Sequence, residues 1–174
     1  MEFYEVINTR RSVRSYRSDP IPDDVMGRIL DAARVAPSGS NRQPWRYVLV
    51  KNPDVKKKVA NLCGGQTWIA SAPVVVVACG LDIHYDRGGY MGPMSFLLDS
   101  AIGLTHLMLA ARAEGVGCCW IGLFDNDALM DLLDIPPDWN VAAVMPLGWP
   151  KEPAWGPPVK RKTIEEISSV DQWF

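Results

Sequence analysis

The 174-residue sequence has little of what several common protein classes need. It holds four cysteines, with neither a CxxC pair nor zinc-ligand spacing, and only two histidines. We therefore expect no metal site. The cysteines are expected to be reduced and to pack as small buried hydrophobic residues, and reduced thiols favour a cytoplasmic location. The four cysteines are Cys63, Cys79, Cys118 and Cys119.

A charge excess and a long hydrophobic run are missing as well. The 18 basic and 20 acidic residues give a formal net charge of -2, so neither nucleic acid nor an anionic membrane is expected as the main partner. The start, "MEFYEVINTRRSVRSY", lacks the apolar stretch of a secretory signal. The run "APVVVVACGL" is too short to span a bilayer, and the longer apolar stretch near residues 94–113 is interrupted by Asp99 and His106.

Several catalytic signatures are also absent. No GxxxxGK[ST] is present, which excludes an NTP-binding P-loop, and "GVGCCW" lacks the third glycine and the following helix of a dinucleotide-binding fingerprint. No Ser-His-Asp or Cys-His pairing stands out. His106, alone on an apolar helix, is expected to be a satisfied core histidine.

What is present is a pattern of alternating helices and strands, which we interpret as one domain over residues 1–174. The expected helices cover residues 2–9, 22–36, 52–63, 94–113 and 125–134, and the expected strands cover residues 45–51, 72–80, 115–124 and 141–149. The second strand is a continuous β-branched run and should be buried on both faces. Helix 94–113 is too hydrophobic for a surface element and should be central, whereas the lysines of helix 52–63 should form a solvated face.

Residues 146–174 are expected to form an extended C-terminal arm. Five prolines and two tryptophans fall in its first half, and proline at that density favours an extended, pre-ordered chain. The arm should lie along a surface, its own or a partner subunit's, and deliver Lys160, Arg161 and Lys162 to a specific place.

A basic cluster near the N-terminus places Arg10, Arg11, Ser12 and Arg14 within five residues. If this segment were helical, Arg10 and Arg14 would share a face, at a cost of a few tenths (roughly 0.2–0.5) of a kcal/mol unless an anion sits there. A phosphate would reverse the sign, since each charge-assisted hydrogen bond to it contributes roughly 1.5–3 kcal/mol. The alternative is a solvated basic patch. Together with residues 160–162 and the polar loop at Ser38, a phosphate site is the better interpretation.

Four segments in order carry a family resemblance: "RRSVRSY", "APSGSNRQPWRYVLV", "GVGCCWIGLFD" and the closing "PLGWP…VKRKTIEEI". The ordered set covers nearly the whole chain and resembles the nitroreductase family of FMN-dependent oxidoreductases. The resemblance implies an α+β fold with a mixed central β-sheet flanked by helices. It also implies a homodimer with FMN at the subunit interface, in which the arm wraps the partner.

The resemblance assigns the two basic segments to the cofactor. Arg10, Arg11 and Ser12 would hold the FMN phosphate, with Arg161 and its neighbour Lys160 closing on it from the arm. Arg14 would reach the N1/O2 edge of the flavin ring, where a cation favours the reduced anionic ring and tunes its potential.

The polar loop and the "CWIGL" segment are assigned to the flavin ring. Pro37, Ser38 and Gly39 would pack near the ring, commonly from the other subunit, while Asn41 and Gln43 supply hydrogen bonds. The backbone N–H of Gly122 would face flavin N5, where glycine permits a close approach. Three side chains would lie beside the ring and Gln66 would reach its pyrimidine edge. The three are Trp120, Ile121 and Leu123.

The expected function is ping-pong hydride transfer from NAD(P)H, through FMN, to a nitroaromatic, a quinone or a similar small acceptor. The segment "YDRGGYMGPMSF" is the candidate substrate lid, with contacts from Tyr85, Arg87, Tyr90 and Met94. One alternative keeps FMN but changes the chemistry, to reductive dehalogenation or flavin fragmentation. The other alternative is a flavin-binding protein without catalytic activity.

Overall fold

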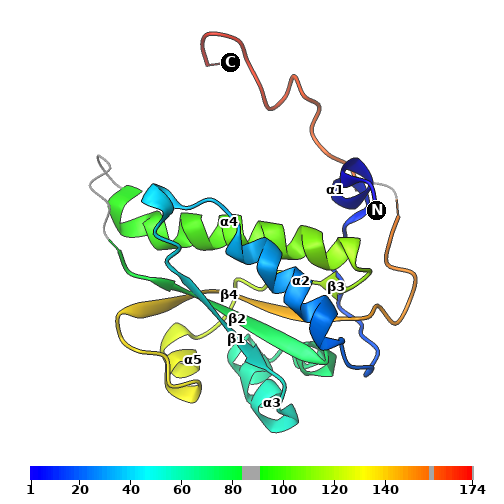
Figure 1. The fold of residues 1–174 in the computed structure, drawn as a ribbon, viewed down its shortest axis with the longest axis vertical. Coiled ribbons are helices and arrows are strands. Elements are labelled where there is room, and N and C mark those ends of the chain that lie inside the picture. Colours follow the sequence, from blue (N-terminus) through cyan, green and yellow to red (C-terminus); the bar gives the residue numbers. More distant parts are fainter. Residues whose placement is uncertain (84–90, 157–158, 174) are drawn as a thin grey trace.

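The chain forms three layers, helices on both sides of one sheet (Figure 1). A computed structural model describes residues 1–83, 91–156 and 159–173. Its four strands lie in the order β1-β2-β4-β3 and pair antiparallel. They are β1 (Trp45–Val50), β2 (Val74–Leu81), β3 (Gly117–Cys118) and β4 (Trp139–Gly148). The α+β fold is confirmed. The expected mixed sheet is antiparallel in all its named strands, and a parallel contact joins Ser12 to Cys118 as an isolated bridge.

Five α-helices are described around this sheet. The pair α2 and α4 covers one face, and α3 and α5 cover the other (Figure 1). The first helix packs against α4. Two 3-10 turns, at Gly39–Asn41 and Thr67–Ser71, complete the regular structure. The helices are α1 (Phe3–Thr9), α2 (Asp23–Arg34), α3 (Pro53–Leu62), α4 (Met91–Ala113) and α5 (Asn126–Leu132).

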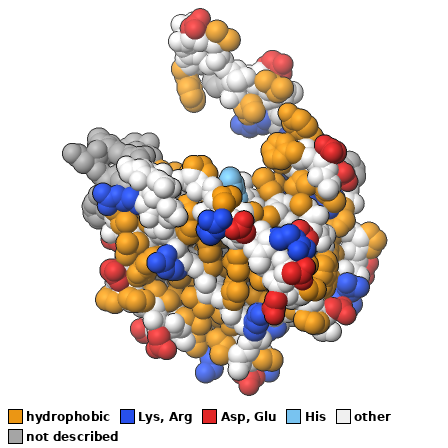
Figure 2. All heavy atoms as spheres, in the orientation of Figure 1, with side chains coloured by type: hydrophobic (Ala, Val, Ile, Leu, Met, Phe, Trp, Pro, Cys, Tyr) orange, Lys and Arg blue, Asp and Glu red, His pale blue; other side chains and the backbone are white. Residues whose placement is uncertain are grey.

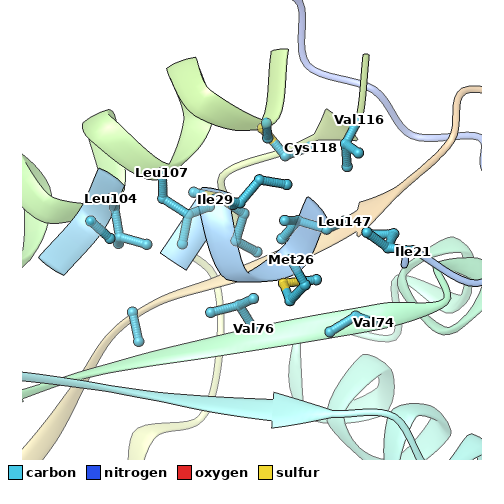
Figure 3. Packing of buried hydrophobic residues seen from close by; sticks show 14 of the residues in the cluster. Ile21, Met26, Ile29, Val74, Val76, Leu104, Leu107, Val116, Cys118 and Leu147 are labelled. Carbon is cyan, nitrogen blue, oxygen red and sulfur yellow. The ribbon is translucent and has the colours of Figure 1, made fainter. Parts of the chain in front are cut away.

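Strand β2 is central and buried on both faces, as its β-branched run predicts. Alternate side chains of a strand point to opposite faces. Val74 and Val76 therefore enter the core beneath α2 and α4, whereas Val75 and Val77 enter the core above α3 and α5. In the first core, Ile29 from α2 and Leu104 and Leu107 from α4 pack toward the sheet (Figure 3).

Side-chain caps explain where two helices begin. The Asn52 side chain accepts hydrogen bonds from the backbone N–H of Asp54 and of Val55, directly before Pro53 opens α3. Asp125 caps α5 in the same way through the N–H of Ala128. The lysines of α3 do not all form the expected solvated face. Lys56 is buried, and its Nζ donates to the carbonyl oxygen of Ala72, which ties α3 to the start of β2.

Helix α4 is only half a core helix. Leu104, Leu107 and Ala111 are fully buried against the sheet, which marks residues 94–113 as a core element although the segment is long and apolar enough to cross a membrane. On the opposite side, Met94 and Leu98 are 47% and 45% exposed. A central helix would be buried on all sides. The prediction is therefore wrong for the outer side of α4, which no other part of the described chain covers.

The C-terminal region leaves the body after β4. Pro146–Gly148 belong to β4, so the arm begins at Trp149. Residues 149–151 run beside residues 15–17, with backbone hydrogen bonds from Arg17 to Trp149 and from Lys151 to Ser15. Residues 159–173 are exposed and extend away from the body (Figure 1). Figure 2 shows hydrophobic side chains gathered near the place where the arm leaves the body.

Candidate functional site

The basic cluster lies on an extended segment that follows α1. The N–H of Val13 donates to the carbonyl of Cys118 at 2.9 Å, and Val13 is buried against Gly117, where a Cβ would lie 2.7 Å from it. Because alternate residues of an extended chain face opposite sides, Arg10, Ser12 and Arg14 share one side. A helix over Arg10–Arg14, the condition considered from the sequence, is wrong. The extended form gathers three candidate residues where a helix would have paired two.

The parallel bridge between Ser12 and Cys118 brings this side of the segment next to Cys119. Burial raises its pKa, and the charge of Arg14, a hydrogen bond from Ser12 and the charge of Arg10 act in the opposite direction. Cys119 is buried, whereas Ser12 and Arg14 are exposed. The exposed Ser12 and Arg14 and the half-buried Arg10 thus lie above a closed floor, an arrangement that suits an anionic group.

Arg11 points to the other side of the same segment. Its guanidinium donates to the carbonyl oxygens of Asn8 at 3.1 Å and of Gly156. Beside it, the buried Arg112 donates from Nε to Thr9 Oγ1 at 3.0 Å and lies 4.2 Å from the centre of the Trp155 ring. These contacts hold the root of the arm. Sequence analysis did not single out Arg112 or Trp155, and a lone arginine in an apolar helix was the available signal.

The turn after β3 lies beside this cluster. Ile121 exchanges two backbone hydrogen bonds with Val144, at 2.9 and 3.1 Å, and its side chain is buried in the core. Trp120 and Leu123 are 38% and 66% exposed. A Cβ on Gly122 would lie 3.9 Å from its nearest neighbour, the Trp120 Nε1. The backbone at Gly122 is therefore approachable between two exposed apolar side chains.

Residues 63–66 pack under this turn although they are remote in the sequence. The N–H of Asp125 donates to the carbonyl of Leu62 at 2.9 Å. Gly64 has a φ of +69°, which favours glycine, and a Cβ there would lie 2.9 Å from Leu123 Cδ2, so this turn touches the Leu123 side chain. Gln66 follows closely, with Nε2 donating to the carbonyl of Cys63 at 2.9 Å. The structure therefore brings Gln66 to the same region as Leu123.

The polar loop, Pro37–Trp45, is strained and holds itself together. Ser40, Asn41 and Gln43 have φ values of 50°, 54° and 51°, and residues other than glycine and asparagine lose roughly 1–2 kcal/mol each in this region. The N–H of Gln43 donates to Ser38 Oγ at 2.9 Å, and its Nε2 donates to the carbonyl of Asn41 at 2.9 Å. Strain of this kind collects at functional sites, so the loop has a fixed shape before any ligand arrives.

The loop and the basic cluster lie at opposite ends of α4. The loop touches α4 where the N–H of Gly39 donates to Asp99 Oδ1 at 3.1 Å, and the α1 end touches it at Arg112. Thirteen residues separate these two positions, which is about 20 Å along a helix. Within one chain, therefore, the structure brings Arg10, Ser12 and Arg14 toward the Trp120–Leu123 turn but keeps residues 37–43 away from them.

The remaining predicted residues are the substrate contacts and the basic residues of the arm. Tyr85, Arg87 and Tyr90 lie outside the described residues, and Met94 is exposed on the first turns of α4. Lys160 and Arg161 are exposed on the arm. In the described parts of the chain, no group of three or more His, Cys, Asp and Glu side chains is placed to bind a metal ion.

The nitroreductase family model matches residues 7–82 and 63–149. The chain belongs to the nitroreductase family. A protein of Archaeoglobus fulgidus named "Putative NADH dehydrogenase/NAD(P)H nitroreductase" is 32% identical over 155 residues, with 87% of each chain covered. A nitroreductase family protein from Clostridium novyi NT has a similar structure, with a TM-score of 0.80, 33% identity and 87% of each chain covered.

Other nitroreductase relatives carry different names. The 5,6-dimethylbenzimidazole synthase of Rhodobacter capsulatus is 30% identical, covering 84% of this chain and 83% of its own. Iodotyrosine deiodinase 1 of Rattus norvegicus is 26% identical, covering 95% and 68%. The NADPH:FMN oxidoreductase of Vibrio harveyi has a TM-score of 0.87 at 24% identity, covering 99% of this chain and 78% of its own, a likeness of fold alone. Membership therefore establishes an oxidoreductase family in which more than one reaction occurs.

Proposed function

We propose that this nitroreductase-family protein binds FMN, takes hydride from NAD(P)H and reduces a small acceptor such as a nitroaromatic or a quinone by a ping-pong mechanism. The observation that carries the proposal is the pairing of the Arg10–Arg14 segment with Cys118, which sets Arg10, Ser12 and Arg14 on one side of a chain that runs toward the approachable backbone of Gly122. A phosphate and a flat apolar ring are the two chemical features that such a pair of surfaces accepts. The NAD(P)H nitroreductase name of the Archaeoglobus fulgidus relative supports the reaction.

The donor set fits the phosphate end of FMN. Arg10 and Ser12 present a guanidinium and a hydroxyl on one side of the extended segment and would hold the phosphate oxygens. Arg11 is the least direct of the predicted ligands, because its guanidinium donates to the carbonyls of Asn8 and Gly156. Its charge would still contribute to the field at the phosphate, since it lies next to Arg10.

The ring end would lie along the Trp120–Leu123 turn. When bound, FMN supplies hydride acceptance and donation at its N5 atom. The N–H of Gly122 would face N5, with Trp120 and Leu123 excluding water from the ring. Arg14 would place its charge near the N1/O2 edge, where negative charge develops on reduction, and Gln66 would bond the pyrimidine edge. These side chains position, charge and shield the ring, and none has to exchange a proton.

The second half of the site would come from a second copy of the chain. The polar loop lies about 20 Å along α4 from the basic cluster, and the loop end of α4 carries an exposed apolar stripe. Met94, Leu98 and Ile102 repeat every four residues and are 47%, 45% and 38% exposed. An exposed apolar stripe of this kind marks an interaction surface, and a two-fold dimer would set each loop against the partner's basic cluster.

The arm would complete the dimer. The arm carries exposed apolar side chains, which a partner surface would bury. They are Ile164, Ile167, Val170 and Trp173. Wrapping the partner would bury them and would bring Lys160 and Arg161 toward a phosphate. The root of the arm is already fixed by Arg112 and Arg11, so its direction of departure is set before the partner arrives.

Anaerobic addition of NADH and NADPH to the purified protein tests the proposed function. We expect a flavin absorbance spectrum, from flavin that co-purifies or is added as FMN, and we expect it to bleach with at least one of the two reductants. Flavin that stays oxidised with both would favour a binding protein. Failure to bind added FMN would overturn the phosphate interpretation of Arg10 and Ser12.

A second candidate keeps FMN and changes the acceptor chemistry. The deiodinase and synthase relatives favour it, because they show that the family performs other reactions at comparable identity. Incubating the reduced protein with iodotyrosine, and in parallel following labelled FMN for fragmentation, separates these reactions from nitroaromatic or quinone reduction. Release of iodide or conversion of the flavin label would replace the first proposal.

A further inference from the structure

The strained loop is seated on one side of α4 by two residues a single turn apart. Asp99 accepts a hydrogen bond from the N–H of Gly39 at 3.1 Å. Four residues later, a Cβ on Gly103 would lie 2.5 Å from the Tyr47 hydroxyl and 3.7 Å from the Trp45 ring. Residues four apart lie on the same face of a helix. The two ends of the loop therefore meet α4 at adjacent points.

Asp99 is unusual in its surroundings. It is 6% exposed on a mainly apolar helix, and a buried carboxylate persists only where it is hydrogen-bonded. The backbone N–H of Gly39 is one such partner, and hydrogen bonds to a charged acceptor are stronger than neutral ones. Some of the loop's bonds, such as Gln43 N–H to Ser38 Oγ, are internal to it. At its far end the Leu81 N–H donates to the Pro44 carbonyl at 2.9 Å, which attaches the loop to β2. The Asp99 bond attaches the first half of the loop to α4.

We infer that Asp99 and Gly103 form a seat that fixes the flavin-lining loop, and that Asp99 is a positioning residue for cofactor binding. The inference rests on the proposed function for its link to FMN, but the seat itself is a property of the flavin-free chain. The carboxylate holds the first half of the loop through Gly39. The missing side chain at Gly103 lets Trp45 and Tyr47, at the start of β1, pack against the helix and so fixes the far end of the loop.

The first test compares Asp99→Ala, Asp99→Asn and Ser100→Ala. Backbone amide exchange is measured by NMR in flavin-free protein, and the FMN dissociation constant by fluorescence. Asp99→Ala should accelerate exchange of the Gly39 amide at least tenfold while leaving the central β2 amides unchanged. It should also raise the FMN dissociation constant roughly tenfold to a hundredfold, the range expected for a lost bond to a charged acceptor.

Two variants distinguish loss of the Asp99–Gly39 hydrogen bond from a general loss of packing around α4. Asp99→Asn keeps an acceptor oxygen and should restore both values to within about threefold of the native protein. Ser100→Ala removes a buried hydroxyl that has no hydrogen-bond partner among the described residues and should match the native protein. Two results would contradict the proposed role of Asp99. One is a native-like exchange rate of the Gly39 amide in Asp99→Ala, and the other is an Asp99→Asn protein as defective as Asp99→Ala. If native protein bound no FMN, the proposed function would fail while the exchange result would still decide the seat.

A second pair of variants does not depend on Asp99 at all. Gly103→Ala should weaken FMN binding about tenfold, since its methyl group collides with the Tyr47 hydroxyl. Adding Tyr47→Phe removes the colliding oxygen and should recover most of the loss. A Gly103→Ala protein that binds FMN normally, or a double variant no better than the single one, would contradict the second half of the seat.

Discussion

The two ends of α4 hold the two halves of the candidate site in different ways. At the basic end, backbone pairing fixes the chain: Val13 to Cys118 and Ile121 to Val144, with Arg10 and Arg14 projecting from it. At the loop end, side chains fix the chain, because Ser38, Gln43 and Asp99 supply the bonds. Substitutions at the basic end should therefore change FMN binding or flavin reduction without changing the local structure, whereas those at the loop end should change FMN binding and local structure together.

The largest expected effect is at Arg10. Arg10→Ala should raise the FMN dissociation constant roughly tenfold to a hundredfold, because it removes a charge-assisted bond to phosphate. The free energy of unfolding of the flavin-free protein should change by about 0.5 kcal/mol or less. FMN titration and denaturant unfolding give the two values. Arg17→Ala is the matched control, since Arg17 lies on the same segment and pairs with Asp19 in solvent. Equal losses of affinity in both variants would reduce the cluster to a nonspecific basic patch.

Arg14→Ala should separate chemistry from binding. Loss of the cation at the ring edge should slow flavin reduction by NAD(P)H roughly tenfold or more, with a smaller change in the FMN dissociation constant. Stopped-flow bleaching of the flavin absorbance measures the rate, and potentiometry should show a lower reduction potential. An unchanged rate of hydride transfer would show that the charge of Arg14 does not assist flavin reduction.

A smaller effect compares two serines directly. Ser38→Ala removes the acceptor of the Gln43 N–H bond and should cost about 1 kcal/mol of unfolding free energy as well as several-fold in FMN affinity. Ser12→Ala should weaken FMN binding to a similar extent and leave stability nearly unchanged, since Val13 and Cys118 hold that backbone. Thermal unfolding without flavin measures the difference. Equal destabilisation by both substitutions would erase the contrast between the two ends.

The sequence predicts the layers well because the signals are local. The β-branched run of β2 and the helix predicted over residues 52–63 depend on residues close together in the chain, and the structure has both. The extended form of residues 10–14 was not predicted, since it depends on pairing with Cys118, over a hundred residues away. Burial of Lys56 has the same origin, because its acceptor is the carbonyl of Ala72.

The candidate site shows the same division. The four ordered motifs were sufficient to propose Arg10, Ser12 and Gly122, because each of these residues lies within a motif. Asp99 entered sequence analysis only as an interruption of an apolar stretch, although its bond to Gly39 attaches the loop. Nothing local distinguishes a buried carboxylate with a backbone partner from one at the surface. Such residues become visible only when the fold brings the two segments together.

Subunit complementation tests the central claim that each site combines the basic end of one chain with the loop end of another. Arg10→Ala and Asp99→Ala proteins, each impaired in FMN binding, are mixed, exchanged and re-equilibrated, and tight FMN sites are then counted by titration. If the ends come from different chains, each mixed dimer contains one fully native site, and about a quarter of all sites should recover native affinity. If both ends came from one chain, every site in the mixture would carry a defect, and no recovery would be seen.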